Sequence, residues 1–325
     1  MNAASSLHEY QRWKRWEPLF WLLALASPWY LSGHALLINE VAIVALFALS
    51  LDLVMGYAGV VSLGHAAFFG MGAYAAALFA KHINPDPVMG LFFGIAVSTV
   101  LGALASLSIM RGTSLTLLMV TMGVALILME LANKLDWLTG GADGLQGVIM
   151  GPVHVPFVGR FEFDLYGQVA AWYSLAVLFV FFLLSRRFVQ SPLGGTLMAL
   201  RDNRLRAMAI GIPVTARLAL IYTIAAGVAG AAGALLAQTT SFASVEVFAF
   251  DRSADLVLLV VIGGAGWLYG GVIGAAIFKV LQDWISSITP QYWTFWIGLF
   301  LVVLMMVGRE RVIRPWTWVS RGKKK

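Results

Sequence analysis

Long stretches without a charged side chain constrain the fold of this chain more than any other feature of its sequence. Asp, Glu, Lys and Arg are all absent from residues 18–39, 41–51, 53–80, 88–110, 112–129, 167–185, 218–238, 256–278 and 291–308. Most of these runs are long enough to cross a hydrocarbon layer of about 30 Å as a helix. Because a backbone in lipid must satisfy its own hydrogen bonds, we expect membrane helices; a membrane β-barrel would show short alternating segments instead.

The composition agrees with a membrane protein and narrows the possible chemistry. Only 12% of the 325 residues are charged and 60% are apolar, against about 25% and 45–50% in soluble domains. The chain has no cysteine, which excludes disulfides, cysteine-ligated metals and cysteine nucleophiles. We therefore predict an all-α fold, a polytopic transmembrane helical bundle with about ten membrane segments, some of them short.

The distribution of basic residues predicts the orientation of this bundle. With the N-terminus inside, most of the 22 Lys and Arg residues fall on the cytoplasmic side: Arg12, Lys14, Arg15, Arg111, Arg186, Arg187, Arg201, Arg204, Arg206, Arg217, Arg309, Arg311, Arg314, Arg321, Lys323, Lys324 and Lys325. This bias follows the positive-inside rule, so the net charge of +6 sets the topology and indicates no nucleic-acid partner. We expect a cytoplasmic N-terminal segment (1–17), a transmembrane domain (18–308) and a basic cytoplasmic tail (309–325).

The first apolar run has a second interpretation. Ala24-Leu25-Ala26, after a basic start, resembles a signal-peptide cleavage site. The apolar pattern continues through Trp29 and Tyr30 into the next span, which favours an uncleaved first helix.

Glycine clusters interrupt two of the apolar runs, one in each half of the chain. The stretch 39–81 is too long for one helix and is expected to break near Gly56, Gly59 and Gly64. In the second half, short helices over 254–264 and 267–283 are expected to meet at a glycine turn, because glycine costs about 1 kcal/mol against alanine inside a helix. Paired interruptions of this kind mark the path through transporters; tight helix packing is the alternative.

The longest cytoplasmic loop, residues 186–217, has helical signals of its own. Pro192 is suited to open a helix and Gly211 to close one. The segment between them is amphipathic, which is unusual for a plain linker. It is either a coupling helix that docks on a cytosolic partner or a basic loop lying on anionic lipid; the residues alone favour neither.

A few polar residues have more than one interpretation each. Asp52 lies in an apolar span, where a charge costs about 2.5–3.5 kcal/mol; it is part of a path or gate, a carboxylate hydrogen-bonded to a neighbouring helix, or a protonated carboxyl group. His65 is either a path residue or a packed core histidine. Lys279 and Asp283, at i and i+4, are expected to pair near the outer face. The outer loop 133–166 is either a docking surface for a binding protein or a structured surface loop.

Several short motifs, taken together and in order, resemble the branched-chain amino-acid ABC transporter permeases of the LivM type. They are Gly56-Tyr57-Ala58-Gly59 with Ser62-Leu63-Gly64-His65-Ala66-Ala67-Phe68, Gly72-Ala73-Tyr74, Thr139-Gly140-Gly141-Ala142-Asp143-Gly144-Leu145, Ser191-Pro192-Leu193-Gly194 with Ala199-Leu200-Arg201-Asp202-Asn203, and Gly263-Gly264-Ala265-Gly266. The resemblance covers residues 38–308, and the motifs are specific only in combination.

The resemblance implies a permease subunit of a bacterial inner-membrane importer that works by alternating access. It implies a second, LivH-like permease, two cytosolic ATPases that hydrolyse the ATP, and a periplasmic substrate-binding protein; this chain itself is expected to bind no cofactor and to have no enzymatic activity. The ATPase coupling loop is expected to contain Gly194, Ala199, Arg201, Asp202, Asn203 and Gly211. With Asp52 added for its polarity, the expected translocation path contains Asp52, Gly56, Gly59, Ser62, Gly64, His65, Gly263, Gly264 and Gly266.

Other function classes fit the residues less well. A stand-alone secondary transporter would need intramembrane charges for ion coupling, for which Asp52 is the candidate. A membrane enzyme would need clustered His, Asp or Glu, and the five histidines are scattered. The phosphate-binding pattern G-x-x-x-x-G-K-[ST] is absent, as expected if partners hydrolyse the ATP. Urea, amides and small carboxylates, which related permeases move, are alternatives to branched-chain amino acids as substrate.

Overall fold

The computed structural model describes residues 16–109, 114–155, 159–164, 166–292, 295–300 and 302. The elements are α2 (Trp16–Tyr30), η1 (Ser32–His34), α3 (Ala35–Asp52), η2 (Leu53–Tyr57), α4 (Ala66–His82), α5 (Pro87–Ile109), α6 (Ser114–Lys134), α7 (Asp136–Thr139), η3 (Gly141–Asp143), β1 (Val153–Val155), β2 (Gly159–Phe161), α8 (Gln168–Val189), α9 (Pro192–Asp202), α10 (Arg204–Ala209), α11 (Val214–Thr240), η4 (Val245–Phe248), α12 (Phe250–Gly263) and α13 (Leu268–Ile288). Most of the predicted N-terminal segment (1–17) and the whole tail (309–325) lie outside the described residues.

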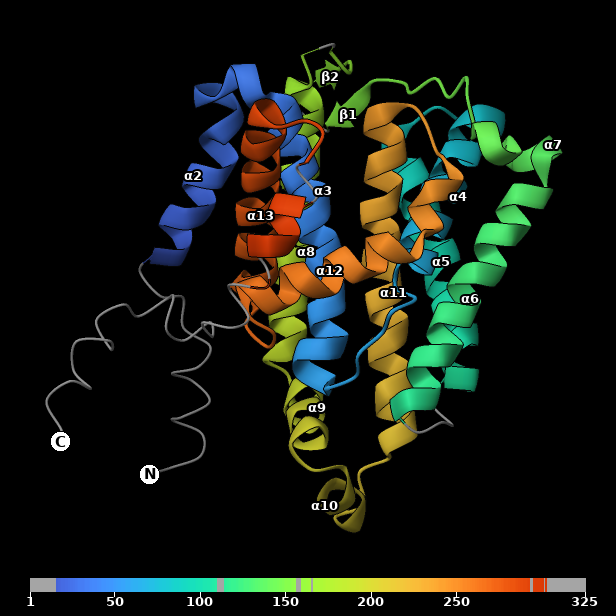
Figure 1. The fold of residues 1–325 in the computed structure, drawn as a ribbon, viewed down its shortest axis with the longest axis vertical. Coiled ribbons are helices and arrows are strands. Elements are labelled where there is room, and N and C mark those ends of the chain that lie inside the picture. Colours follow the sequence, from blue (N-terminus) through green and yellow to red (C-terminus); the bar gives the residue numbers. More distant parts are fainter. Residues whose placement is uncertain are drawn as a thin grey trace, which may run out of the picture.

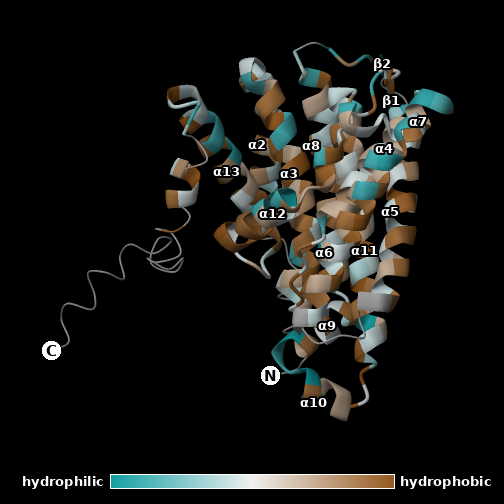
Figure 2. Cartoon of the chain, turned by 45° about the vertical axis from the view of Figure 1, so that its right-hand side comes forward, coloured by the Kyte–Doolittle hydropathy of each residue, from teal (hydrophilic) through white to brown (hydrophobic). Residues whose placement is uncertain are grey.

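The long helices form a bundle, as the uncharged runs predict. In Figure 1 they run side by side along the long axis, with α9 and α10 at one end and α7 and the β1–β2 hairpin at the other. Apolar residues cover the length of the long helices, and hydrophilic residues gather mainly toward the two ends (Figure 2). The all-α membrane bundle is confirmed, and the loops expected inside and outside lie at opposite ends of it.

Six helices in the described part of the chain are long and apolar enough to cross a membrane: Ser32–Tyr57, Pro87–Leu107, Thr116–Lys134, Gln168–Val189, Val214–Thr240 and Leu268–Ile288. Three further helices in the bundle, α2, α4 and α12, are shorter, with 15, 17 and 14 residues. The predicted total of about ten membrane segments is therefore not confirmed.

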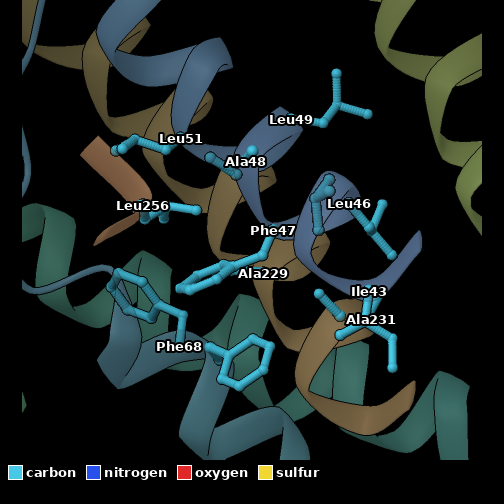
Figure 3. Packing of buried hydrophobic residues seen from close by; sticks show 14 of the residues in the cluster. Ile43, Leu46, Phe47, Ala48, Leu49, Leu51, Phe68, Ala229, Ala231 and Leu256 are labelled. Carbon is cyan, nitrogen blue, oxygen red and sulfur yellow. The ribbon is translucent and has the colours of Figure 1, made fainter. Parts of the chain in front are cut away.

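Helices α3 and α11 form the centre of the bundle. In the spans that contain them, 72% and 78% of the most apolar window is buried inside the chain, against 28% for the α5 span and 22% for the α6 span. Figure 3 shows Phe47 of α3, Phe68 of α4 and Ala229 of α11 packed together. Helix α11 is rich in alanine and glycine, and small residues allow the close helix approach that drives packing in lipid.

Helix α2 is joined to the bundle by a buried ion pair. Arg186, near the end of α8, donates a hydrogen bond from Nη1 to Oε2 of Glu17, and both residues are buried. Trp21 of α2 and Tyr269 of α13 both pack against Phe182 of α8, with ring centroids 4.8 and 4.7 Å from that of Phe182. The buried pair and these aromatic contacts together hold α2 against α8 and α13.

Removing one partner of this pair is expected to destabilise the protein strongly. Arg186→Met leaves the Glu17 carboxylate buried without its charge partner, which costs about 3–5 kcal/mol, whereas the double variant Glu17→Leu/Arg186→Met is expected to be close to neutral. Thermal unfolding of the detergent-purified protein, followed by tryptophan fluorescence, measures both. The control is Lys134→Met, which breaks the exposed pair of Lys134 with Glu130 (3.3 Å) and is expected to cost about 0.5 kcal/mol or less. Equal effects of Arg186→Met and Lys134→Met would contradict the prediction.

The outer loop 133–166 is structured in its described part. Strands β1 and β2 pair antiparallel, with Val153 opposite Phe161. Leu145 forms a bridge with Ala243, just after α11, and the N–H of Gly151 donates to the carbonyl of Pro85, just before α5 (2.8 Å). These links hold the loop against the outer ends of the helices, which agrees with the structured-surface interpretation.

Candidate functional site

The first predicted glycine break is present at the end of α3. The α-helix ends at Asp52 and continues as one π-helical turn, Leu53–Tyr57. Gly59 then takes a left-handed backbone (φ 69°), and residues 59–65 are irregular until α4 begins at Ala66. The backbone of this segment departs from helical hydrogen bonding inside the bundle, as the glycines predict.

The second break separates α12 from α13. Helix α12 ends at Gly263 and α13 begins at Leu268, so the break between the helices predicted over 254–264 and 267–283 is confirmed. Helix α12 is short, as predicted, whereas α13 has 21 residues and is long enough to cross a membrane. Gly264 and Gly266 have φ of 105° and 82°, which other residues rarely adopt. The chain turns here from α12, which lies across the bundle, into α13, which runs along it (Figure 1), and a Cβ on Gly263 would overlap the backbone of Gly270.

The two breaks touch each other. The N–H of Gly266 donates to Oδ1 of Asp52 at 2.7 Å, and Asp52 is fully buried. A Cβ atom on Gly56 would overlap both the Asp52 carboxylate and the Gly266 nitrogen. This bond agrees with the structural interpretation of Asp52: its carboxyl group joins the end of α3 to the α12–α13 turn. A further role of Asp52 in a path or gate stays a prediction.

His65 and Ser62 are buried in helix packing in this conformation. His65 Nε2 lies 3.0 Å from Ser50 Oγ, and its ring stacks on Phe47 with centroids 6.0 Å apart. Ser62 Oγ lies 3.3 Å from the hydroxyl of Tyr222 on α11. Gly64 packs against the backbone of α6. Their role as path residues stays a prediction, and the contacts seen here are those of a core.

The segment between α8 and α11 forms two short helices, as the loop signals predict. In α9, Leu197 and Leu200 are buried, whereas Leu205, Met208 and Ile210, in and just after α10, are 75%, 50% and 75% exposed. The apolar residues of α9 thus pack against the bundle, whereas those of α10 are left uncovered.

Local contacts account for four of the predicted coupling-loop residues. Gly194 abuts the backbone of Val189, where a Cβ would overlap it. Asn203 caps α10 by accepting the Arg206 N–H (2.9 Å) at its side chain, and its own N–H donates to the carbonyl of Ala199 (3.1 Å). Gly211 ends the turn after α10 with φ 84°. Asp202 is exposed.

Arg201 extends from the end of α9 into the two glycine breaks. Its Nη1 donates a hydrogen bond to the carbonyl oxygen of Gly56. A Cβ on Gly59 would lie 3.0 Å from Arg201 Cγ, and a Cβ on Gly266 would lie 2.6 Å from Arg201 Nη1. We call Asp52, Gly56, Gly59, Gly266 and Arg201 the glycine node; it joins residues predicted to lie in the path to one predicted to lie in the coupling loop.

Helix α12 carries charge in the middle of the bundle. It crosses the other helices at mid-height in Figure 1. Its apolar side is buried, with Leu256 and Val260 almost inaccessible, whereas Asp251, Arg252 and Asp255 are exposed. Exposed charges at the centre of a bilayer are costly, so this face of α12 is unsuited to contact lipid.

One predicted ion pair is wrong. Lys279 Nζ lies 3.0 Å from Oε2 of Glu40 on α3, and no salt bridge joins Lys279 to Asp283 within the part of the chain that the structure describes. Packing of α13 against α3 brings Glu40 within reach, whereas the exposed Asp283 stays apart although the i,i+4 spacing permits the pair.

Comparison with known proteins places this geometry in a family. The family model described as "Branched-chain amino acid transport system / permease component" matches residues 35–308. The chain belongs to this permease family. The match covers both glycine breaks, the coupling loop and α12, and it begins where α3 begins.

Individual members of the permease family are similar over most of their length. The chain is 27% identical to the high-affinity branched-chain amino acid transport system permease protein LivM of Salmonella typhimurium, and equally to that of Escherichia coli, over 91% of this chain and 73% of each relative. It is 26% identical to the probable branched-chain amino acid transport permease protein LivM of Methanocaldococcus jannaschii, over 73% of this chain and 77% of that protein. No solved structure matches.

Two features of this permease were missed from its sequence. The inward direction of the Arg201 side chain has no signal in the sequence, because the arginine looks like any basic residue of a cytoplasmic loop. The charged face of α12 does have one: Asp251, Arg252 and Asp255 follow one another within two helical turns just before an uncharged run.

Proposed function

We propose that this chain is a membrane-embedded permease subunit of an ATP-binding-cassette importer for branched-chain amino acids. The family match over residues 35–308 is the observation that carries the proposal. The names of the LivM relatives support the substrate class and the LivM-type role. We propose no enzymatic activity for the chain itself.

The proposed assembly contains a second, LivH-like permease, two cytosolic ATPases that hydrolyse ATP, and a periplasmic substrate-binding protein. The proposed location is the bacterial inner membrane, with both termini cytoplasmic. The positive-inside distribution of Lys and Arg supports this orientation. The structured outer loop 133–166, at the end of the bundle opposite α10 (Figure 1), is the proposed docking surface for the binding protein.

The proposed contact with the ATPases is α10. Leu205, Met208 and Ile210 expose apolar side chains beside Arg204 and Arg206, at the end of the molecule farthest from the outer loop. An amphipathic helix that presents apolar anchors suits a groove in a soluble partner. A loop lying flat on lipid would not need to extend away from the bundle as α10 does in Figure 1.

The proposed mechanism is alternating access, with a path along the α12 face. A charged surface at mid-height is stable next to water or to polar groups of another subunit, not next to lipid. If the path lies between this chain and the second permease, the charged face of α12 is next to water and to polar groups of that subunit. The two glycine breaks give the chain non-helical segments beside this path, as in other transporters.

Co-purification and uptake together test this proposal. Affinity-tagged protein from native membranes is expected to bring down a second permease and two ATPases. The reconstituted complex is expected to accumulate leucine only with ATP and the binding protein. Recovery of this chain alone or as a homo-oligomer, with uptake driven by an ion gradient, would instead support a secondary transporter.

Charges placed on α10 are expected to release the ATPases. The variant Leu205→Asp/Ile210→Asp is expected to lose at least about ten-fold in ATPase recovery, because two apolar anchors, each worth about 1.5–3 kcal/mol when buried, are replaced by carboxylates. Ile149→Asp, on the outer loop at 77% exposed, is the matched control and is expected to recover the ATPases normally. Normal recovery in the double variant would exclude α10 as the docking site.

A further inference from the structure

The position of Arg201 carries an inference beyond docking. We propose that Arg201 is a positioning residue through which movement of α9 reaches both glycine breaks at once, and that its bond to Gly56 holds the inner end of the path closed in this conformation. The inference rests on the proposed function, since it takes α9 to be moved by the ATPases.

Helix α9 is attached to the bundle firmly enough to carry Arg201 as a rigid body. Leu197 and Leu200 are buried, and Gly194 lies directly against the backbone of Val189 at the end of α8. Helix α10, by contrast, exposes its apolar residues. A force applied to α10 is therefore transmitted to α9, whose last turn contains Arg201.

Arg201 replaces a helical hydrogen bond that the first break removes. In a continuous α-helix the N–H of Val60 would donate to the carbonyl of Gly56, four residues earlier. Here the Val60 N–H donates to Val54 at 3.1 Å, and the Gly56 carbonyl accepts from Arg201. A backbone carbonyl inside a membrane protein needs a partner, so the arginine stabilises the π-helical end of α3.

The same guanidinium lies against the second break. A Cβ on Gly266 would lie 2.6 Å from Arg201 Nη1 and 3.0 Å from the Gly56 oxygen, so the turn fits there only without a side chain. Asp52 holds the other side of this turn through the Gly266 N–H. Arg201 thus contacts both interrupted segments, and withdrawing it leaves the Gly56 carbonyl to be satisfied by water, which opens the node from the inside.

The experiment compares arginine variants in the full transporter with its ATPases and binding protein. Arg201→Ala and Arg201→Gln are expected to keep the ATPase subunits and to hydrolyse ATP. Leucine transported per ATP is expected to fall at least about ten-fold, the lower bound for loss of one charge-assisted hydrogen bond. Arg201→Lys, which keeps one donor but not the planar fork, is expected to be intermediate. Arg187→Ala, exposed at the end of α8 and outside both α9 and α10, removes the same charge from the same side of the bundle and is expected to resemble the wild type.

A second measurement follows the node directly. The chain has no cysteine, so nitroxide labels placed by Val61→Cys and Trp267→Cys, two exposed positions within the breaks, report one distance once any cysteines of the partner subunits have been replaced. In the wild type this distance is expected to differ between the nucleotide-free and the vanadate-trapped states. In the Arg201→Ala background it is expected to be the same in both.

Each remaining outcome overturns the inference. Loss of the ATPases in Arg201→Ala and Arg201→Gln would make Arg201 a docking residue, and unchanged coupling or an unchanged distance shift would make it a passive contact. The proposed function fails separately: a wild-type complex that transports no branched-chain amino acid refutes that proposal, whereas the label distance still reports whether Arg201 links the nucleotide state to the node.

Discussion

Replacing Gly72 by valine is expected to prevent the bundle from folding, whereas replacing Gly123 by valine is expected to leave it folded. A Cβ on Gly72, in α4, would overlap the backbone of Gly230 in α11. Backbone atoms cannot rotate away, so the two helices must separate, and such overpacking costs about 1–3 kcal/mol or more. In lipid this close packing is itself the main force that holds helices together.

The control for Gly72→Val is closely matched. Gly123 lies in the middle of another long helix, α6, and a Cβ there would meet nothing within 4 Å. Size-exclusion chromatography in mild detergent gives the monodisperse fraction of each variant, and thermal unfolding gives its stability. Comparable profiles for Gly72→Val and Gly123→Val would show that α4 and α11 are not packed as described.

A cysteine introduced at Asp255 is expected to react with a water-soluble methanethiosulfonate reagent in the reconstituted transporter. The rate is expected to exceed that of Val100→Cys by at least about a hundred-fold, because a thiol in apolar surroundings is kept from ionising and the thiolate is the reactive form. Val100 is an exposed apolar residue of α5, a helix whose exposed side chains are uncharged. Leucine supplied with the binding protein is expected to slow the reaction at position 255.

This reaction separates the environments that could surround α12. Equal, slow rates at positions 255 and 100 in every nucleotide state would show that the α12 face is sealed against another subunit, and the proposed path would have to lie elsewhere. A fast reaction that leucine does not slow would make the face aqueous but separate from the substrate. Because this chain has no other cysteine, its signal comes from one position, and the transporter with the wild-type chain gives the background of the partner subunits.

The sequence predicts those features of the fold that depend on local chemistry. The breaks near Gly59 and Gly264 could be predicted because their positive φ angles favour glycine. The start of α9 at Pro192 and the turn at Gly211 follow from similarly local preferences.

Contacts between distant segments could not be predicted in this way. Lys279 pairs with Glu40 rather than with Asp283, because helix packing, not spacing along the chain, decides which carboxylate is within reach. For the same reason the partners of Asp52 and Arg201, far away in the sequence, appear only in the folded chain.

The central position of α11 has a consequence for biosynthesis. Helices α4 and α5 pack on α11, yet the ribosome completes α11 only after residue 240. Until then the small-residue faces of α4 and α5 lack the helix on which they pack in the folded chain, and they remain exposed to lipid or to the insertion machinery. Chains that end before α11 are therefore expected to be substrates for membrane proteases, and chains that end just after it are expected to persist longer.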